Sequence, residues 1–392
     1  MRPIVALTPA TSTFANDKPP MTQDNQSKRI ARLASTMADL EVDALLVNSE
    51  INVRYLSGFT GDSTWLLVRP DASATLLSDG RYEIQLAQEC PDLPVAIRPP
   101  SQKMGGLLAE MVSSMPNVKR IGFEADHVHV SMLRDLESRL SDVTWVETSS
   151  RVEQLRAIKD ADEIATIRRA VSVAQQAFTK VTANFSPKKT ECEIYYELEA
   201  EMRRLGAEGV SFHPIIGAEP NGALPHYTPG NIPLGDCRTL LMDWGAKVDG
   251  YCSDLTRTLH RPGSTSPTSD RFAAAYEAVL EAQLAAIAAI HDGVDAVTVD
   301  TAARAVLAKA GLGDAFNHGL GHGFGLQIHE DPRMGPSSTE TLKSGMVVTV
   351  EPGVYFANEF GIRIEDDLLV TDTGCEVLSD LPKGLDDCPL VM

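Results

Sequence analysis

Residues 242–254 read MDWGAKVDGYCSD and set two aspartates, Asp243 and Asp254, on either side of an Asp-Gly turn signal. A tight turn centred on Val248 and Asp249 predicts a hairpin in which the two aspartates face each other. Directly opposed residues have Cβ atoms roughly 4.5–5.5 Å apart, and two ionised carboxylates that close repel each other. A buried pair therefore indicates a bound cation, whereas an exposed pair would be ordinary turn chemistry.

Two further segments carry polar residues that are unusual for their positions. The first, HGLGHGFGLQIHEDPR at residues 318–333, holds His318, His322 and His329 among glycines that let the backbone approach a ligand closely. In the second, MVVTVEPG, Glu351 ends an apolar strand, where an unpaired carboxylate would be costly to bury. Both segments therefore offer candidate metal ligands.

The remaining candidates lie in GIRIED and NGALPHYTPGN. In GIRIED, Arg363 and Glu365 share one strand face because side chains alternate with a period of two. The alternative is an exposed strand on which charges of both signs alternate. The turn-rich segment NGALPHYTPGN presents His226 just upstream of the aspartate hairpin, and taken alone this signal is weak.

Taken together, these segments supply two aspartates, two glutamates and a histidine, each at the end or turn of a strand. Oxygen-rich ligation with a single imidazole suits Mn²⁺, Co²⁺ or Zn²⁺, and bridging carboxylates would hold two ions roughly 3.5–4 Å apart. A single histidine is more often structural than functional. It is the combination that predicts a metal site at the aspartate hairpin.

The composition, 43% hydrophobic and 23% charged, is that of an ordinary soluble globular protein. A formal net charge of −19 without any Lys/Arg run argues against a nucleic-acid partner. The six cysteines show no CxxC or repeated spacing, which argues against a disulfide framework and predicts a cytoplasmic setting. Neither a secretory signal nor a membrane partner is expected, and translation could start at Met1 or Met21.

The length of 392 residues predicts more than one domain. Residues 1–27 are expected to form a flexible extension. Helix-like and strand-like stretches alternate over residues 28–150, which predicts an α/β domain. Residues 151–392 begin with a long helical stretch, continue through a capping box from Thr190 to Glu193, and end in strands, which predicts a second, α+β domain.

The motifs resemble those of the pita-bread metallopeptidases, family M24, which include Xaa-Pro dipeptidase (prolidase), Xaa-Pro aminopeptidase and methionine aminopeptidase. DWGAKVDGYCSDLTRT, HGLGHGFGLQIHE, VTVEPG and GIRIED stand in the family's order, and the resemblance covers about residues 28–385. It implies a creatinase-type N-terminal domain over residues 28–150 and a pita-bread catalytic domain over residues 151–392. Methionine aminopeptidases resemble only the C-terminal half, so the N-terminal domain argues against that assignment.

The resemblance implies a dinuclear site that holds two divalent ions, Mn²⁺ first and Co²⁺ or Zn²⁺ as alternatives. A hydroxide bridging the ions would attack the carbonyl before proline, because metal ligation lowers the pKa of water toward neutrality. Glu351 would also accept the proton that this water releases. The ligands, matched motif by motif, would be Asp243, Asp254, His322, Glu351 and Glu365.

The family also uses side chains that do not bind metal. His226 and His329 match positions that contact the substrate and stabilise the tetrahedral intermediate, and His318 would line the same cleft. Arg363 would support Glu365 from outside the ligand set.

Arg333 bears on the choice between dipeptidase and aminopeptidase. It matches a position where prolidases place an arginine against the dipeptide's terminal carboxylate, a task that suits a guanidinium. The alternative is an exposed loop arginine, and with it an Xaa-Pro aminopeptidase acting on longer peptides. The implied partners are a proline-containing peptide and a second copy of the chain in a homodimer.

Two further functions are alternatives to a peptidase. One is a metal-free enzyme of the same fold, as in creatinase, and the other is a non-catalytic pita-bread module that binds proteins. Both are disfavoured because a metal-free protein has no reason to keep five ligands.

Overall fold

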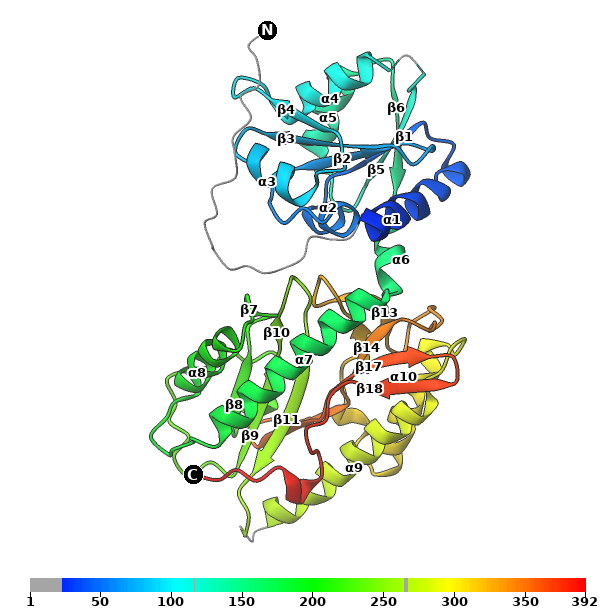
Figure 1. Ribbon diagram of the computed structural model, residues 1–392. Helices are drawn as coiled ribbons and strands as arrows, with labels where there is room; N and C mark the ends of the chain where they lie inside the picture. The colour runs from blue at the N-terminus through cyan, green and yellow to red at the C-terminus, as the bar shows by residue number, and fades with distance from the viewer. Residues whose placement is uncertain (1–22, 116, 264–266) are drawn as a thin grey trace.

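The computed structural model describes residues 23–115, 117–263 and 267–392, which form two domains joined by helix α6 (Arg151–Ala157) (Figure 1). The creatinase-type and pita-bread domains expected from the sequence are both present.

Most of the predicted flexible extension, residues 1–22, lies outside the described residues. The prediction is wrong for residues 23–27, because helix α1 (Gln23–Ser35) begins at Gln23. Burial stabilises this first turn, since the Gln26 side chain is buried and its Nε2 donates to the carbonyl oxygen of Ser57 at 2.8 Å.

The N-terminal domain is a six-stranded sheet with helices on both faces, in the strand order β4-β3-β2-β1-β5-β6. Alternate residues of β1 enter different cores, Leu45 and Val47 on one face and Ala44 and Leu46 on the other. The mixed sheet confirms the α/β prediction. Besides α1, its elements are β1 (Ala44–Val47), α2 (Glu50–Ser57), β2 (Trp65–Val68), β3 (Ala74–Asp79), α3 (Glu83–Glu89), β4 (Val95–Arg98), α4 (Met104–Ser113), β5 (Arg120–Glu124), α5 (Val130–Arg139) and β6 (Thr144–Thr148).

The C-terminal domain places strands between two helical layers, with α7 and α8 on one side and α9 and α10 on the other (Figure 1). A three-stranded sheet, β11-β9-β8, lies beside a five-stranded sheet, β13-β12-β14-β17-β18. Its helices are α7 (Ala161–Thr182), α8 (Glu191–Arg204), α9 (Pro267–Ala289) and α10 (Ala296–Lys309). Its strands are β7 (Gly209–Val210), β8 (Ile215–Ala218), β9 (Thr239–Trp244), β10 (Ala246–Lys247), β11 (Leu255–His260), β12 (Gly321–Gly323), β13 (Glu330–Met334), β14 (Val347–Val350), β15 (Gly353–Phe356), β16 (Phe360–Arg363), β17 (Asp366–Thr371) and β18 (Gly374–Val377).

Local sequence signals explain how the helices are set against these strands. The predicted capping box from Thr190 to Glu193 is confirmed at the start of α8. Helix α7 packs on β9 through the stacked rings of Phe178 and Trp244, whose centroids are 4.3 Å apart. Helix α9 is long and apolar enough, by length and composition, to cross a membrane, but Tyr276 and neighbouring side chains are buried in the core of this domain.

The aspartate hairpin has a different register from the predicted one. Asp249 (φ 50°) and Gly250 (φ 82°) form the turn, one residue later than predicted, and Asp243 lies opposite Thr256 rather than Asp254. Positive φ at both central positions is the conformation that Asp-Gly favours in tight hairpins. Moving the pairing by two residues keeps each side chain on its face of the sheet, so both aspartates still point into one site.

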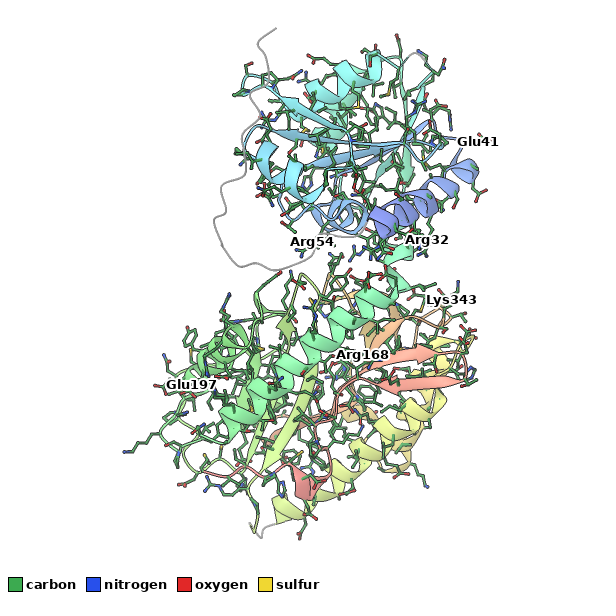
Figure 2. All side chains as sticks on the ribbon, viewed as in Figure 1. Arg32, Glu41, Arg54, Arg168, Glu197 and Lys343 are labelled. Carbon is green, nitrogen blue, oxygen red and sulfur yellow. The ribbon has the colours of Figure 1, made fainter. Side chains whose placement is uncertain are left out.

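The turn of this hairpin touches the N-terminal domain. Arg54 of α2 lies at the border between the domains (Figure 2), and a Cβ atom at Gly250 would collide with its guanidinium. Its Nη2 is also 3.9 Å from Glu208 Oε1. The hairpin that carries the aspartates therefore packs against both domains.

Candidate metal centre

Asp243, Asp254 and Glu365 form a buried cluster of carboxylates. One oxygen of each lies within 4.8 Å of one oxygen of the others, and the residues are 8%, 5% and 1% exposed. Asp243 comes from β9, Asp254 directly precedes β11, and Glu365 joins β16 to β17 while bridging to the backbone of Thr256. The three-stranded and five-stranded sheets of the domain meet here and bring together three carboxylates.

His322 presents an imidazole nitrogen to this cluster. Its Nε2 is 3.6 Å from Asp254 Oδ2 and 3.5 Å from Glu351 Oε1, distances too long for hydrogen bonds but suited to sharing an ion. Its Nδ1 is 3.1 Å from the carbonyl oxygen of Gly323, which can only accept, so Nδ1 carries the proton and Nε2 offers its lone pair. Burial lowers the pKa of His322 to about 3, which keeps the ring neutral.

The carboxylates destabilise one another's ionised forms. Burial raises the pKa of Asp254 and Glu365 well above the usual range, and repulsion from their carboxylate neighbours adds to the effect. Burial also raises the pKa of Glu351 to about 8, although the Arg363 guanidinium opposes this rise. One arginine is too little positive charge for four acidic groups, and divalent cations would relieve the repulsion.

The oxygens of Asp243 show where an ion would fit. Oδ2 accepts a hydrogen bond from Arg363 Nη2 at 2.6 Å, whereas Oδ1 is buried and has no hydrogen-bond partner among the described residues. A buried oxygen without a donor is costly unless a cation or water satisfies it. The five predicted ligands therefore converge, and their oxygen-rich donor set with one imidazole fits divalent metal ions.

Arg363 and Thr256 connect two of the carboxylates, Asp243 and Glu365, through hydrogen bonds. Arg363 was expected to support Glu365, but it bonds directly to Asp243 and reaches Glu365 only through Thr256. Arg363 Nε donates to Thr256 Oγ1 at 3.1 Å, and Thr256 Oγ1 donates to Glu365 Oε2 at 2.6 Å. Thr256 was not predicted, yet its position two residues after Asp254, on the same strand face, was a usable signal.

Tyr355 extends the network to His318. The phenol oxygen of Tyr355 accepts from Arg363 Nη1 at 2.7 Å and lies 3.0 Å from His318 Nε2. Burial, together with the nearby Arg363 charge, lowers the pKa of His318 to about 4. His318 thus lies in the polar network that holds the carboxylates, and the sequence carried no signal for its partner Tyr355.

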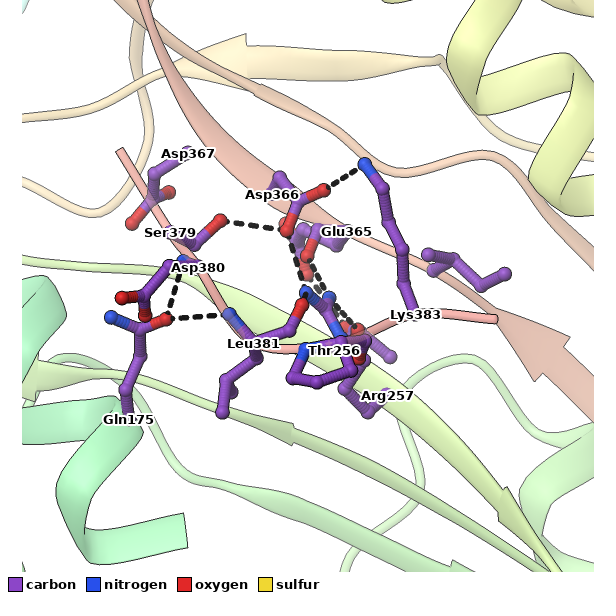
Figure 3. A network of polar contacts seen from close by, with 12 residues as sticks. Gln175, Thr256, Arg257, Glu365, Asp366, Asp367, Ser379, Asp380, Leu381 and Lys383 are labelled. Carbon is purple, nitrogen blue, oxygen red and sulfur yellow. Dashed lines mark hydrogen bonds and ion pairs between the residues drawn. The ribbon is translucent and has the colours of Figure 1, made fainter. Parts of the chain in front are cut away.

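A second network fixes the backbone of Glu365 (Figure 3). Arg257, 1% exposed, donates through Nη1 to the carbonyl oxygen of Glu365 at 2.6 Å and through Nη2 to Asp366 Oδ1 at 2.7 Å. Ser379 and Lys383 each bond to Asp366 at 2.6 Å. These bonds anchor the segment after β18 next to Glu365.

Asp367 is a further buried carboxylate that the sequence analysis did not single out. Its Oδ2 accepts a hydrogen bond from the backbone nitrogen of Asp254 at 3.1 Å, and burial raises its pKa well above the usual range. Asp367 therefore holds the backbone of the hairpin in place at Asp254.

His226 and His329 are exposed at the opening of the site. The ring of His329 meets that of His322 edge to face, with centroids 4.5 Å apart. Burial raises the pKa of Asp243, and the nearby Arg363 guanidinium and His226 ring counteract this, so His226 lies near the same cluster. The structure therefore brings both histidines to the metal centre.

The loop that carries His226 is anchored by Glu191, the first residue of α8. Glu191 is fully buried, and its two oxygens accept four hydrogen bonds, two of them at 2.9 Å, one at 2.7 Å and one at 3.1 Å. Sequence reasoning placed Glu191 only within a helix-capping segment. The four donors are Ala218 N, Asn221 Nδ2, Tyr227 Oη and Gly230 N.

Arg333 projects from β13 beside the histidines. Its backbone pairs with His322 across β12 and β13, so the two residues are neighbours across the strands. The residue is exposed, and its guanidinium forms no ion pair within the part of the chain that the structure describes. Burial lowers the pKa of His329, and the nearby charge of Arg333 contributes to this decrease.

Comparison with known families agrees with this site. The model described as Metallopeptidase family M24 matches residues 165–372, and that described as Creatinase/Prolidase N-terminal domain matches residues 29–158. The chain belongs to metallopeptidase family M24.

Individual relatives match over nearly their whole length. The uncharacterized peptidase YqhT of Bacillus subtilis is 34% identical over 363 residues, covering 91% of this chain and 99% of that protein. The solved Xaa-Pro dipeptidase from Bacillus anthracis is 33% identical with a TM-score of 0.87, covering 92% of this chain and 99% of that chain. The X-Pro aminopeptidase from Thermotoga maritima is 32% identical with a TM-score of 0.82, covering 91% and 98%.

Proposed function

We propose that this metallopeptidase hydrolyses the bond between an N-terminal residue and proline, and that it acts on dipeptides in preference to longer peptides. We further propose that it uses two Mn²⁺ ions, with Co²⁺ or Zn²⁺ as alternatives. Similarity to the dipeptidase from Bacillus anthracis supports the substrate class. The buried carboxylates with one unpartnered oxygen support the ions.

Bound ions would act as Lewis acids and lower the pKa of a water molecule. The chain's own residues would do the remaining work. His226 and His329, exposed beside the carboxylates, would donate hydrogen bonds to the carbonyl oxygen of the cleaved bond as negative charge develops there. Glu351, 3.5 Å from His322, would hold the proton that the attacking water loses.

Arg333 is the observation that favours a dipeptidase. Its exposed guanidinium lies beside His322 and His329 and forms no ion pair among the described residues, although Glu340 accepts a hydrogen bond from the Arg333 backbone nitrogen at 2.6 Å. In Xaa-Pro dipeptides the proline carboxylate lies only one residue beyond the cleaved bond. A planar guanidinium can bind that carboxylate through two parallel hydrogen bonds.

The test compares Ala-Pro, Ala-Pro-NH₂ and Ala-Pro-Ala as substrates of the Mn²⁺-loaded protein and of Arg333→Met. We expect Ala-Pro to be the best substrate, and Arg333→Met to raise its KM roughly 10-fold to 100-fold, because a hydrogen-bonded charge pair is lost. Ala-Pro-NH₂, which lacks the carboxylate, should be insensitive to the substitution. Equal KM values for Ala-Pro in both proteins would contradict the role of Arg333.

An Xaa-Pro aminopeptidase is the second candidate, favoured by the similarity to the enzyme from Thermotoga maritima. Faster cleavage of Ala-Pro-Ala than of Ala-Pro would support it. Absence of Mn²⁺-dependent cleavage of all three substrates would instead favour a binding module of the same fold.

A further inference from the structure

A buried polar chain connects the N-terminal domain with the strand that follows His329. Asn52 of α2 accepts a hydrogen bond through Oδ1 from Arg156 Nη1 at 2.8 Å. Arg156, on the connecting helix α6, donates through Nη2 to Glu330 Oε1 at 2.5 Å. Glu330 is the first residue of β13 and directly follows His329.

Burial makes this chain of contacts energetically important. Asn52 is 0% exposed, Arg156 2%, Lys159 5% and Glu330 9%. Lys159 Nζ is 3.3 Å from Glu330 Oε2, so two cations face one carboxylate. Removing one partner of a buried ion pair leaves the other charge uncompensated, and Glu330 is therefore held firmly in place.

The same groups shape the turn that carries His329. Gln327 N donates to Glu330 Oε1 at 2.9 Å, and Arg156 Nη2 donates to Gln327 Oε1 at 2.8 Å. Gln327, two residues before His329, and Glu330, directly after it, are thus both hydrogen-bonded to the guanidinium of Arg156. The position of the His329 backbone depends on where Arg156 lies.

Asn52 has only one orientation that satisfies its partners. Its Nδ2 donates to Glu124 Oε1 at 2.5 Å and to Glu153 Oε1 at 2.6 Å, while its Oδ1 faces the donors of Arg156. Turning the amide over would point its donors at a guanidinium and its oxygen at two carboxylates. The N-terminal domain therefore fixes the acceptor that orients Arg156.

We propose that Asn52 and Arg156 are positioning residues for His329. Through them the N-terminal domain holds Glu330 and the turn before it, so that the imidazole of His329 stays against the ring of His322. The role of His329 in turnover rests on the proposed peptidase function, whereas the placement of the turn does not. The relative position of the two domains then affects turnover without affecting metal binding.

The kinetic test is a double-mutant cycle on Ala-Pro hydrolysis with Asn52→Ala and His329→Ala. We expect Asn52→Ala to lower kcat roughly tenfold, in the range seen when supporting hydrogen bonds of a site are removed, with Mn²⁺ affinity unchanged. In the His329→Ala background, Asn52→Ala should lower kcat no further, because its effect acts through that imidazole. Independent effects of the two substitutions would overturn the proposal.

Tyr55→Phe is the matched control. It removes the hydrogen bond from Tyr55 Oη to the carbonyl oxygen of Leu155, 3.2 Å long, which also joins α2 to α6 but does not involve Arg156. We expect kcat to be unchanged, and an equal loss of kcat in both variants would reduce the role of Asn52 to general domain packing. If Asn52→Ala fails to fold, Arg156→Lys keeps the charge but loses the planar fork that bonds to Asn52 through one nitrogen and to Gln327 and Glu330 through the other, and it should show the same kinetic effect.

Hydrogen–deuterium exchange provides a readout that does not depend on activity. The backbone amides of residues 327–334 should exchange faster in Asn52→Ala than in Tyr55→Phe or the unchanged protein. If the protein cleaves no proline peptide, the proposed function fails while this exchange difference still decides whether Asn52 holds the turn. Equal exchange in all three proteins would overturn the proposal.

Discussion

Two groups of three potential metal ligands lie in different domains and differ in how their carboxylates are satisfied. In the N-terminal group, Glu124 accepts from the backbone nitrogens of Asn48 and Ser49 and from Asn52, at 2.5–2.9 Å. Glu153 accepts from Asn52 and lies 3.2 Å from His127 Nε2. The two groups are Glu124, His127 and Glu153, and Asp243, Asp254 and Glu365.

The C-terminal group has fewer donors for its oxygens. Asp243 Oδ1 is buried with no partner among the described residues, and the pKa of Asp254 and of Glu365 is raised well above the usual range by burial and by mutual repulsion. In the N-terminal group, burial raises the pKa of Glu124 although hydrogen bonds from Ser49, Asn52 and Asn48 oppose the rise, and the pKa of Glu153 is lowered because its hydrogen bonds outweigh the effect of burial. Proximity of ligands alone therefore does not distinguish the two groups, whereas the buried oxygen of Asp243 that lacks a partner among the described residues does.

The largest expected effect comes from removing the histidine of each group. His322→Asn should lower kcat/KM for Ala-Pro by roughly 10³-fold, about 4 kcal/mol of transition-state stabilisation, because the ions lose their single nitrogen ligand. Mn²⁺ content measured by elemental analysis should fall as well. His127→Asn should change neither quantity, and a loss of Mn²⁺ in that variant would show that the N-terminal group also binds metal.

A smaller effect is expected from the threonine behind the carboxylates. Thr256→Val removes the hydroxyl between Arg363 and Glu365 and should lower Mn²⁺ affinity roughly 10-fold to 100-fold, the usual result of removing a partner of a metal ligand. Thr148→Val is the matched control, since this buried hydroxyl bonds only to the carbonyl oxygen of Phe123 at 2.9 Å. It should cost about 1 kcal/mol of stability and leave Mn²⁺ affinity unchanged.

The smallest expected effect is a pH dependence of stability in chelator-treated protein. The pKa of Glu351 in the folded protein is raised to about 8, so the folded state keeps a proton that the unfolded chain has lost. This contribution is fully present below the ordinary carboxyl pKa and is lost as the pH rises through about 8, with a slope of up to about 1.4 kcal/mol per pH unit.

Urea unfolding between pH 5 and pH 8.5 measures this dependence, with chelator in one series and Mn²⁺ in the other. Stability should fall with rising pH only in the chelated series, because bound ions replace the proton. The lowered pKa of Glu153 has the opposite sign, but its contribution is lost only as the pH falls below the usual carboxyl pKa, outside this range. Parallel curves with and without Mn²⁺ would contradict binding of the ions to these carboxylates.

The grouping of the candidate metal ligands could be predicted because their signals are local. Residue type, strand-end position and motif order identified Asp243, Asp254, His322, Glu351 and Glu365, and the fold does bring all five together. The hairpin register could not be predicted as reliably, because an Asp-Gly turn can be centred on either of two adjacent residue pairs. Only pairing with neighbouring strands decides between them.

The sequence by itself determined the two-domain architecture and the chemical class of the site, because hydrophobic periodicity and the spacing of polar residues act over short stretches of chain. The tertiary structure alone decided that Arg363 bonds to Asp243, that Tyr355 joins His318 to this network, and that one oxygen of Asp243 has no partner among the residues that the structure describes. It also decided that Asn52 in one domain reaches the turn of His329 in the other. These features depend on contacts between distant segments, whose geometry is set only when both cores pack.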